Sequence, residues 1–146
     1  MFITDGYNFR NTEIGAVIGL SQLGRLDDIV EKRKQHFDKY LDLISKYDCF
    51  YIPNKEGNSS FSLPFISKDY DLIERLKKVM NDNDIETRPI ISGNLLKQPF
   101  LKEYKLNIKK PNIDIIDKGF YIGNNQFLTN KQFKLLEKIL DENTSI

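Results

Sequence analysis

The sequence predicts an α+β fold, a layered α/β arrangement in which N-terminal helices pack on a small, mostly antiparallel sheet of three or four strands. Near both ends of the chain, apolar residues recur every three or four positions, which is the spacing of an amphipathic helix. Between these stretches, short apolar segments end at glycine, proline or asparagine, as short strands do. The predicted order is helix, helix, strand, strand, helix, strand, short helix, strand, helix, within one domain over 1–146.

Two helices are expected at the N-terminal end, over 12–21 and 24–46. Thr12 can cap the first helix, and Gly24 is expected to bend or break the pair, because glycine in a helix costs about 1 kcal/mol relative to alanine. We expect one continuous apolar stripe to be buried along both helices. The stripe consists of Leu23, Leu26, Val30, Phe37, Tyr40, Leu41 and Ile44. His36, which lies between charged neighbours, is expected on the surface.

The middle of the chain predicts two strands and a helix. Residues 48–53 indicate a short strand that ends in the turn-forming run 54–58. Residues 60–66 are aromatic-rich and alternate, but Pro64 lacks an N–H donor, so we expect an edge strand or a bulge there. Residues 69–82 place their apolar side chains on one face of a helix.

The C-terminal part adds two strands and three helical segments. A strand over 85–91 is followed by a short helix over 99–104, which a proline opens at a position where a missing N–H costs nothing. A helical turn is expected over 113–118 and a strand over 119–123. The last helix, over 130–142, follows a threonine that can cap it. The helices are expected to pack on one side of the sheet.

Composition narrows the function before any motif is considered. The net charge is +1 with acidic and basic residues interleaved, so no basic face is expected to bind nucleic acid or an anionic membrane surface. No apolar run approaches the ~20 residues that cross a bilayer, and no secretory leader follows Met1. With one histidine and Cys49 as the single cysteine, neither a metal cluster nor a disulfide framework is expected. The sequence therefore predicts a cytoplasmic domain.

A run of polar and aromatic residues, Gly-Tyr-Asn-Phe-Arg over 6–10, lies immediately before the first predicted helix. An amide and a guanidinium at the start of a helix suit an anionic ligand, because both donate hydrogen bonds from a rigid support. Taken alone, the run is also compatible with a turn that places Tyr7 and Phe9 in the core and Arg10 in solvent. Composition by itself favours that second interpretation.

A second polar run, over 85–99, contains the sequence Ile-Glu-Thr-Arg-Pro. Pro89 holds Arg88 extended, and a following glycine allows a tight turn that directs Asn94. On its own, the run is compatible with a strand edge that carries a surface arginine. No apolar pocket is evident around Glu86, so no general acid or base is predicted there.

These two runs, together with the segment 121–129, resemble the C-terminal small domain of the DegT/DnrJ/EryC1/StrS family. That family comprises fold-type-I, pyridoxal-phosphate-dependent aminotransferases and 3-dehydratases that act on nucleotide-linked sugars. The resemblance implies that the amide of Asn8 donates to the phosphate of a pyridoxal phosphate bound in the neighbouring subunit of a homodimer. It also places Tyr7 and Arg10 beside the same cofactor cleft.

The same resemblance implies that Arg88 and Asn94 contact the substrate, a nucleotide-linked 4-keto-6-deoxy sugar. The run Gly-Asn-Leu-x-Lys-Gln-Pro over 93–99 looks more like the 3-dehydratase and lipopolysaccharide-sugar branch than the ordinary aminotransferases. No catalytic residue is carried over to this chain. The family's cofactor lysine, or the histidine of the 3-dehydratases, belongs to the large domain.

The resemblance covers the small domain only, so we expect a fragment, a split gene product or an excised domain without the large domain. Such a chain is expected neither to bind pyridoxal phosphate nor to catalyse a reaction by itself. Gly15 and Gly19, one helical turn apart, indicate close packing against a large neighbour that this chain does not contain. The alternative is a non-catalytic α+β binding or regulatory module that pairs with a full-length relative.

Overall fold

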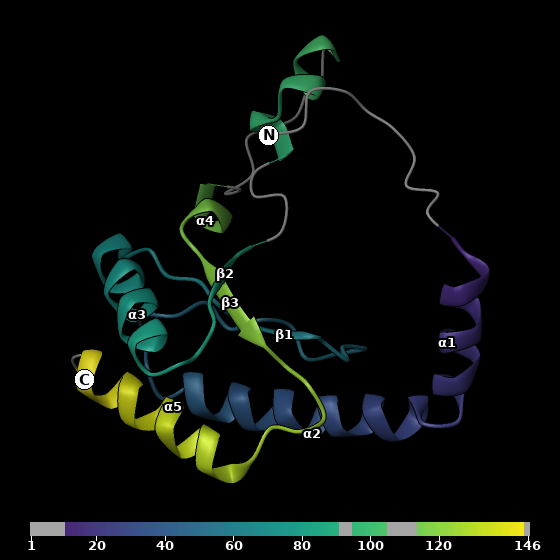
Figure 1. Cartoon of the computed structure of the whole chain (residues 1–146). Helices are drawn as coiled ribbons and strands as arrows, with labels where there is room; N and C mark the ends of the chain where they lie inside the picture. Colours follow the sequence, from purple (N-terminus) through teal and green to yellow (C-terminus); the bar gives the residue numbers. More distant parts are fainter. Residues whose placement is uncertain (1–10, 91–94, 105–113, 145–146) are drawn as a thin grey trace.

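The computed structural model of the chain describes residues 11–90, 95–104 and 114–144. Within these residues the α+β class is confirmed (Figure 1). In chain order the elements are α1 (Glu13–Leu23), α2 (Leu26–Ile44), β1 (Ser62–Phe65), α3 (Tyr70–Asp82), β2 (Arg88–Pro89), the 3-10 turns η1 (Leu95–Lys97) and η2 (Pro99–Glu103), α4 (Asp114–Asp117), β3 (Phe120–Gly123) and α5 (Asn130–Asn143).

The helix boundaries follow the capping residues. Thr12, Asp69 and Thr129 each accept a hydrogen bond from a backbone N–H in the first turn of α1, α3 and α5. In α5 the bond is reciprocal, since the glutamine at the third helical position reaches back to the backbone of the cap. The chain turns between α1 and α2 at Gly24, as predicted. The short helix predicted over 99–104 forms as the 3-10 turn η2.

The apolar stripe predicted along the two N-terminal helices is buried only in its second half. α1 has no buried residue, and Leu23 and Leu26 are 60% and 49% exposed. Burial begins in the middle of α2, whose buried residues are His36, Phe37, Tyr40, Leu43 and Ile44. The prediction of a continuous buried stripe is therefore wrong, because spacing sets a face of the helix but not what packs against it.

The prediction that His36 lies on the surface is also wrong, because its side chain is buried. Its Nδ1 lies 3.0 Å from the backbone oxygen of Asn125, and its ring centroid lies 5.8 Å from that of Phe133. Beside it, the amide of the buried Asn124 donates to two backbone oxygens, one from α2 and one from the segment before β1. These contacts fix the loop between β3 and α5 against α2.

In the described part of the chain the sheet has three antiparallel strands in the order β1-β3-β2. Asn124 N donates to Phe61 O, which makes Leu63 and Ile122 the next hydrogen-bonded pair of the ladder. Pro64 then faces away from β3, where its missing N–H removes no ladder bond. The edge position predicted from Pro64 is confirmed.

The strand predicted over 48–53 does not form. This segment contributes a single bridge, between Phe50 and Ser67. It lies beside the outer edge of β1. Pro64 has no N–H to donate at that edge, so the hydrogen-bond ladder cannot continue along β1.

The strand predicted over 85–91 shortens to Arg88–Pro89 among the described residues, because α3 ends in a Schellman turn. Asp84 adopts a left-handed φ of 58°, and Ile85 N donates to Met80 O at 2.9 Å. The residues after the helix are needed for this reversal, so the chain meets β3 only at Arg88.

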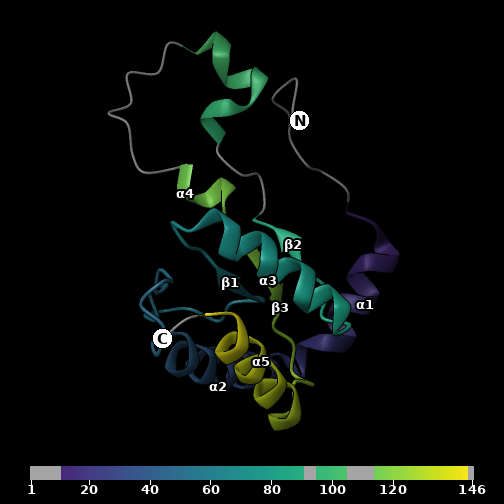
Figure 2. The same cartoon turned by 90° about the vertical axis from the view of Figure 1, so that its left-hand side faces the viewer.

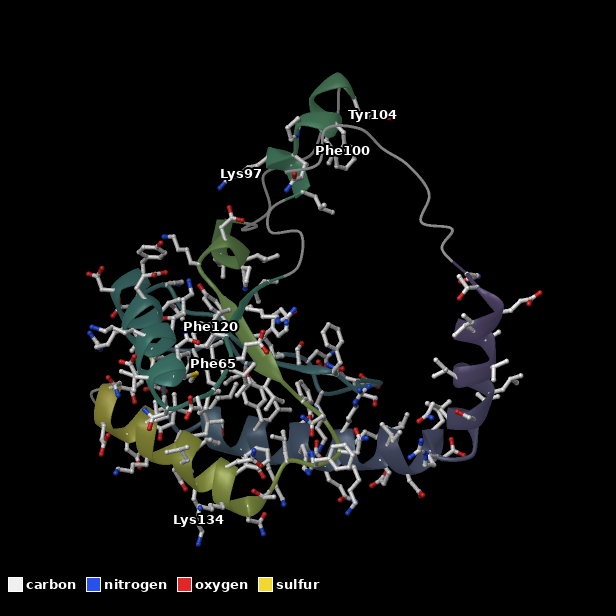
Figure 3. The ribbon with its side chains drawn as sticks, viewed as in Figure 1. Phe65, Lys97, Phe100, Tyr104, Phe120 and Lys134 are labelled. Carbon is white, nitrogen blue, oxygen red and sulfur yellow. The ribbon has the colours of Figure 1, made fainter. Side chains whose placement is uncertain are left out.

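The core lies between the sheet and the helices α2, α3 and α5, which gather on one side of it (Figures 1 and 2). Phe65 of β1 and Phe120 of β3 stack at its centre, with ring centroids 5.1 Å apart (Figure 3). Tyr40 of α2 packs edge-on against Phe65, and its hydroxyl donates to the backbone oxygen of Pro64. α1 stands apart from this body at the far end of α2 (Figure 1).

Candidate functional site

A cavity of about 460 Å³ opens beside β3, at the place where β2 parts from it. Its volume is within the range of small-molecule sites, about 300–1,000 Å³. Among the described residues, β2 pairs with β3 only through Arg88–Tyr121 and Pro89–Phe120, so Ile122 and Gly123 of β3 have no partner in that strand. Apolar side chains from α5, the loop before it, β3 and the turn after α3 line the cavity. They are Ile85, Ile122, Leu128, Phe133, Leu135 and Leu136.

The main chain of Gly123 borders this cavity. Because Asn124 N donates to Phe61 O, the backbone groups of Phe120, Ile122 and Asn124 are directed toward β1. Those of Tyr121 and Gly123 are directed to the other side of β3, where Tyr121 pairs with Arg88. Within the described ranges no strand continues alongside Gly123, so its N–H and C=O face the cavity.

Three charged side chains line the cavity among the described residues: Asp84, Glu86 and Arg88. Arg88 Nε donates a hydrogen bond to Oε1 of Glu86 at 2.9 Å, and Nη2 lies 2.7 Å from the same oxygen in an ion pair. The side chains of Arg88 and Glu86 are 62% and 74% exposed, so the pair lies at the rim. Two carboxylates against one guanidinium give this part of the cavity a formal charge of −1.

An aromatic corner lies beside the ion pair. Phe61 and Tyr121 meet edge to face, with ring centroids 5.9 Å apart and an angle of 82° between the rings. Tyr121 is the register partner of Arg88, which places the two side chains next to each other across the strands. Two residues with amide side chains, Asn125 and Gln132, also belong to the lining. Such a combination suits a ring-shaped polar ligand, which needs apolar walls and a few fixed hydrogen-bonding groups.

Of the five residues that the sequence predicts to bind cofactor or substrate, the structure describes one. Arg88 lies at the rim of the cavity, which is a position from which it could meet a ligand. Tyr7, Asn8, Arg10 and Asn94 fall outside the described residues, and their roles stay predictions.

Sequence reasoning missed Asp84, Glu86 and Tyr121 as residues of the cavity. Glu86 could have been found, because residues two apart in an extended segment share a face and Glu86 precedes Arg88 by two positions. Asp84 and Tyr121 gave no such signal. The first depends on the turn that ends α3, and the second on the register between β2 and β3.

Two tyrosines of the core, Tyr40 and Tyr47, have raised pKa values. Burial raises the pKa of Tyr40 and Tyr47, and the hydrogen bond that Tyr47 donates to Asp141 Oδ1 at 2.5 Å raises the pKa of Tyr47 further. Neither tyrosine lines the cavity. In the described part of the chain no set of three metal-ligating side chains comes together, and no helix there has the length and apolar character needed to cross a bilayer.

The fold is that of a known enzyme domain. The Escherichia coli GDP-4-keto-6-deoxy-D-mannose 3-dehydratase, solved with bound hydrated pyridoxal phosphate, superimposes with a TM-score of 0.79 and 28% sequence identity over 97% of this chain and 38% of that chain. The fold thus belongs to the fold-type-I pyridoxal-phosphate enzymes. The model of the DegT/DnrJ/EryC1/StrS aminotransferase family matches residues 3–122, and this chain belongs to that family. The resemblance inferred from the motifs is confirmed.

Two curated relatives show how much of a family enzyme the chain spans. The GDP-4-keto-6-deoxy-D-mannose 3-dehydratase of Yersinia pseudotuberculosis is 34% identical over 146 residues, which cover 95% of this chain and 37% of that protein. The GDP-perosamine synthase of Escherichia coli O157:H7 is 30% identical over 86 residues, which cover 58% of this chain and 24% of that protein. The chain therefore spans well under half the length of these relatives.

Proposed function

We propose that this chain is the C-terminal part of a pyridoxal-phosphate-dependent enzyme of deoxysugar or lipopolysaccharide biosynthesis. Its substrate is a nucleotide-linked 4-keto-6-deoxyhexose, and its reaction is a 3-dehydration rather than a transamination. The observation that carries the proposal is the extent of the similarity: it covers 95% of this chain for the 3-dehydratase and 58% for the GDP-perosamine synthase.

The state of α1 supports the view that a further domain completes the enzyme. Its large apolar side chains point in several directions around the helix and remain open to solvent: Ile14, Val17, Ile18, Leu20 and Leu23 are 58–75% exposed. A helix that is apolar on all sides is normally enclosed by neighbouring structure. A Cβ at Gly19 would meet nothing within 4 Å, so a neighbour could approach closely there. We propose that the large domain covers α1, and that the intact enzyme is a cytoplasmic homodimer.

Each predicted residue then has a role in binding. Asn8 donates to the cofactor phosphate of the neighbouring subunit, and Tyr7 and Arg10 lie beside the same cleft, where the guanidinium is suited to a phosphate of the cofactor or the substrate. Arg88 and Asn94 hold the nucleotide-sugar and orient it. Pyridoxal phosphate, when bound, supplies the electron sink that the reaction at the keto-sugar requires.

A pair of chimeras tests the proposal. In one, this chain replaces the matched region of the Yersinia 3-dehydratase; in the other, it replaces the matched region of the GDP-perosamine synthase. Turnover of each parent's nucleotide-sugar is measured after folding and cofactor retention have been checked by absorbance and thermal unfolding. We expect the first chimera to work and the second to be at least about tenfold weaker, which corresponds to about 1.4 kcal/mol in the transition state.

The isolated chain is the control, and it should turn over neither substrate. If the first chimera folds and retains the cofactor but is inactive while the second is active, the 3-dehydratase assignment is wrong. Turnover by the isolated chain would contradict the need for a large domain. Within the active chimera, Arg88→Gln should raise KM by about 10- to 100-fold, since a hydrogen bond to a charged group contributes about 1.5–3 kcal/mol.

A further inference from the structure

Arg88, the described residue proposed to bind substrate, already has an anionic partner in this chain. Glu86 and Arg88 are two apart on one extended segment, and both point to the same face, with Thr87 between them directed to Asn81 on α3. The carboxylate of Glu86 thereby occupies the position that an anionic ligand of Arg88 would take.

The ion pair between Glu86 and Arg88 is weak enough for a ligand to displace Glu86. Nε and Nη2 of Arg88 both lie against Oε1 of Glu86, and the hydrogen bond between the two side chains is the single one from Nε. An arginine and a carboxylate hold each other more firmly when two nitrogens meet two oxygens. Both side chains are also mostly exposed, and exposed ion pairs contribute little because water competes with them.

The main chain of Arg88 stays fixed while its side chain is free to turn. Its backbone pairs with Tyr121 of β3, and Pro89 restricts it to the extended region. An exchange of partners at the guanidinium therefore needs rotamer changes only. The lining charges favour such an exchange: Glu86 and Asp84 leave the described part of the cavity negative, so an anionic ligand gains most if Glu86 swings away.

We infer that Glu86 is an internal competitor that occupies Arg88 until the anionic group of the substrate displaces it, and that it thereby limits the affinity of the site for anions. The inference rests on the proposed role of Arg88 in substrate binding. It makes Glu86 a residue that sets affinity without itself being a ligand of the anion.

The test is a titration of the ¹⁵N-labelled full chain with inorganic pyrophosphate, followed through the Nε–Hε resonance of Arg88. Glu86→Gln keeps the shape of the side chain and removes its charge, so it should tighten pyrophosphate binding about two- to fivefold. Glu74→Gln is the matched control, because Glu74 forms an exposed pair with Lys77 on α3 and does not line the cavity. It should leave the affinity unchanged. Arg88→Gln lacks the Nε–Hε group, so this variant is followed through the backbone amides of Tyr121 and Gly123, which border the cavity, and it should abolish their pyrophosphate-dependent shifts.

The outcomes separate this inference from the proposed function. If Glu86→Gln weakens binding, or leaves it unchanged while Arg88→Gln still abolishes it, Arg88 binds the anion but Glu86 is not its competitor, and the inference is overturned. If pyrophosphate fails to shift Arg88 in the native chain and in Glu86→Gln alike, the proposed role of Arg88 fails, and the inference with it. Because both side chains are exposed, neither substitution should unfold the chain, and the full amide spectrum checks this.

Discussion

α1 and α3 are both helices with many apolar residues, but they relate to the rest of the chain in opposite ways. α3 is amphipathic, and it buries Leu72, Ile73, Leu76 and Met80 against the sheet and α5. α1 is apolar around its circumference and has no buried residue. Among the described residues, the packing partner of α3 is present and that of α1 is not. Stability of the isolated chain should therefore depend on α3 and hardly on the side chains of α1.

A matched pair of leucines measures that difference. Leu76→Ala in α3 removes a fully buried side chain and should lower the free energy of unfolding by about 2–5 kcal/mol. Leu20→Ala in α1 removes a side chain that is 69% exposed and should change it by less than about 0.5 kcal/mol. Urea denaturation of both variants provides the measurement. Similar losses in both would mean that α1 is packed within the chain after all.

A matched pair of glycines should give opposite signs. A Cβ at Gly119 would lie 2.9 Å from Ile66 Cγ1 and 3.1 Å from Phe65 O, so Gly119→Ala should cost about 1–3 kcal/mol. At Gly19 nothing lies within 4 Å, and Gly19→Ala should stabilise the chain by up to about 1 kcal/mol through helix propensity. Thermal unfolding distinguishes the two. In the active chimera the benefit at Gly19 should disappear, because there the helix is proposed to be covered.

The elements that the sequence predicts correctly are those determined by local chemistry. Thr12, Asp69 and Thr129 cap their helices with their own side chains, and Pro64 places its strand at an edge through its missing donor. The wrong predictions concern which segments pair as strands and which helix faces are packed against other elements. The stretch 48–53 has strand-like residues, but the strand beside it among the described residues is an edge that cannot continue a ladder.

The candidate site is less predictable for the same reason. Arg88 could be chosen because Pro89 next to it restricts the backbone, which is a local effect. The cavity lies where the residues before Arg88 are not paired with β3, and that depends on a left-handed turn at Asp84, a position where glycine would have been the expected signal. Tyr121 joins the site through strand register, which no single segment of the sequence specifies.

The pH dependence of stability should also come from the packed core and not from α1, because Tyr47 belongs to that core. Its folded-state pKa is raised above the unfolded value of about 10, so the folded state holds the phenolic proton more tightly. The stabilisation is complete below pH 10 and is lost as the pH rises beyond it. Tyr47→Phe should cost about 1 kcal/mol at pH 7, through the lost bond to Asp141, and should flatten the decline above pH 10. The pKa of Tyr40 is also raised, so part of the decline in the free energy of unfolding above pH 10 should remain in this variant.

Urea denaturation of the native chain and of Tyr47→Phe between pH 7 and 11 gives both quantities. Tyr121→Phe is the control, because Tyr121 lies at the cavity and its ring contact with Phe61 does not need the hydroxyl. An unchanged pH dependence in Tyr47→Phe would show that alkaline unfolding starts elsewhere in the chain.

The smallest expected effect concerns the turn that creates the cavity. Asp84 has a φ of 58°, a conformation that glycine adopts without strain, so Asp84→Gly should stabilise the chain by about 0.5–1 kcal/mol. Asp82→Gly, two residues earlier and inside α3, is the control and should destabilise it by up to about 1 kcal/mol. If Asp84→Gly instead destabilises the chain, the carboxylate itself supports the turn. A stabilised variant would mean that the aspartate is kept at a cost to folding, as expected for a residue whose charge serves the cavity rather than the core.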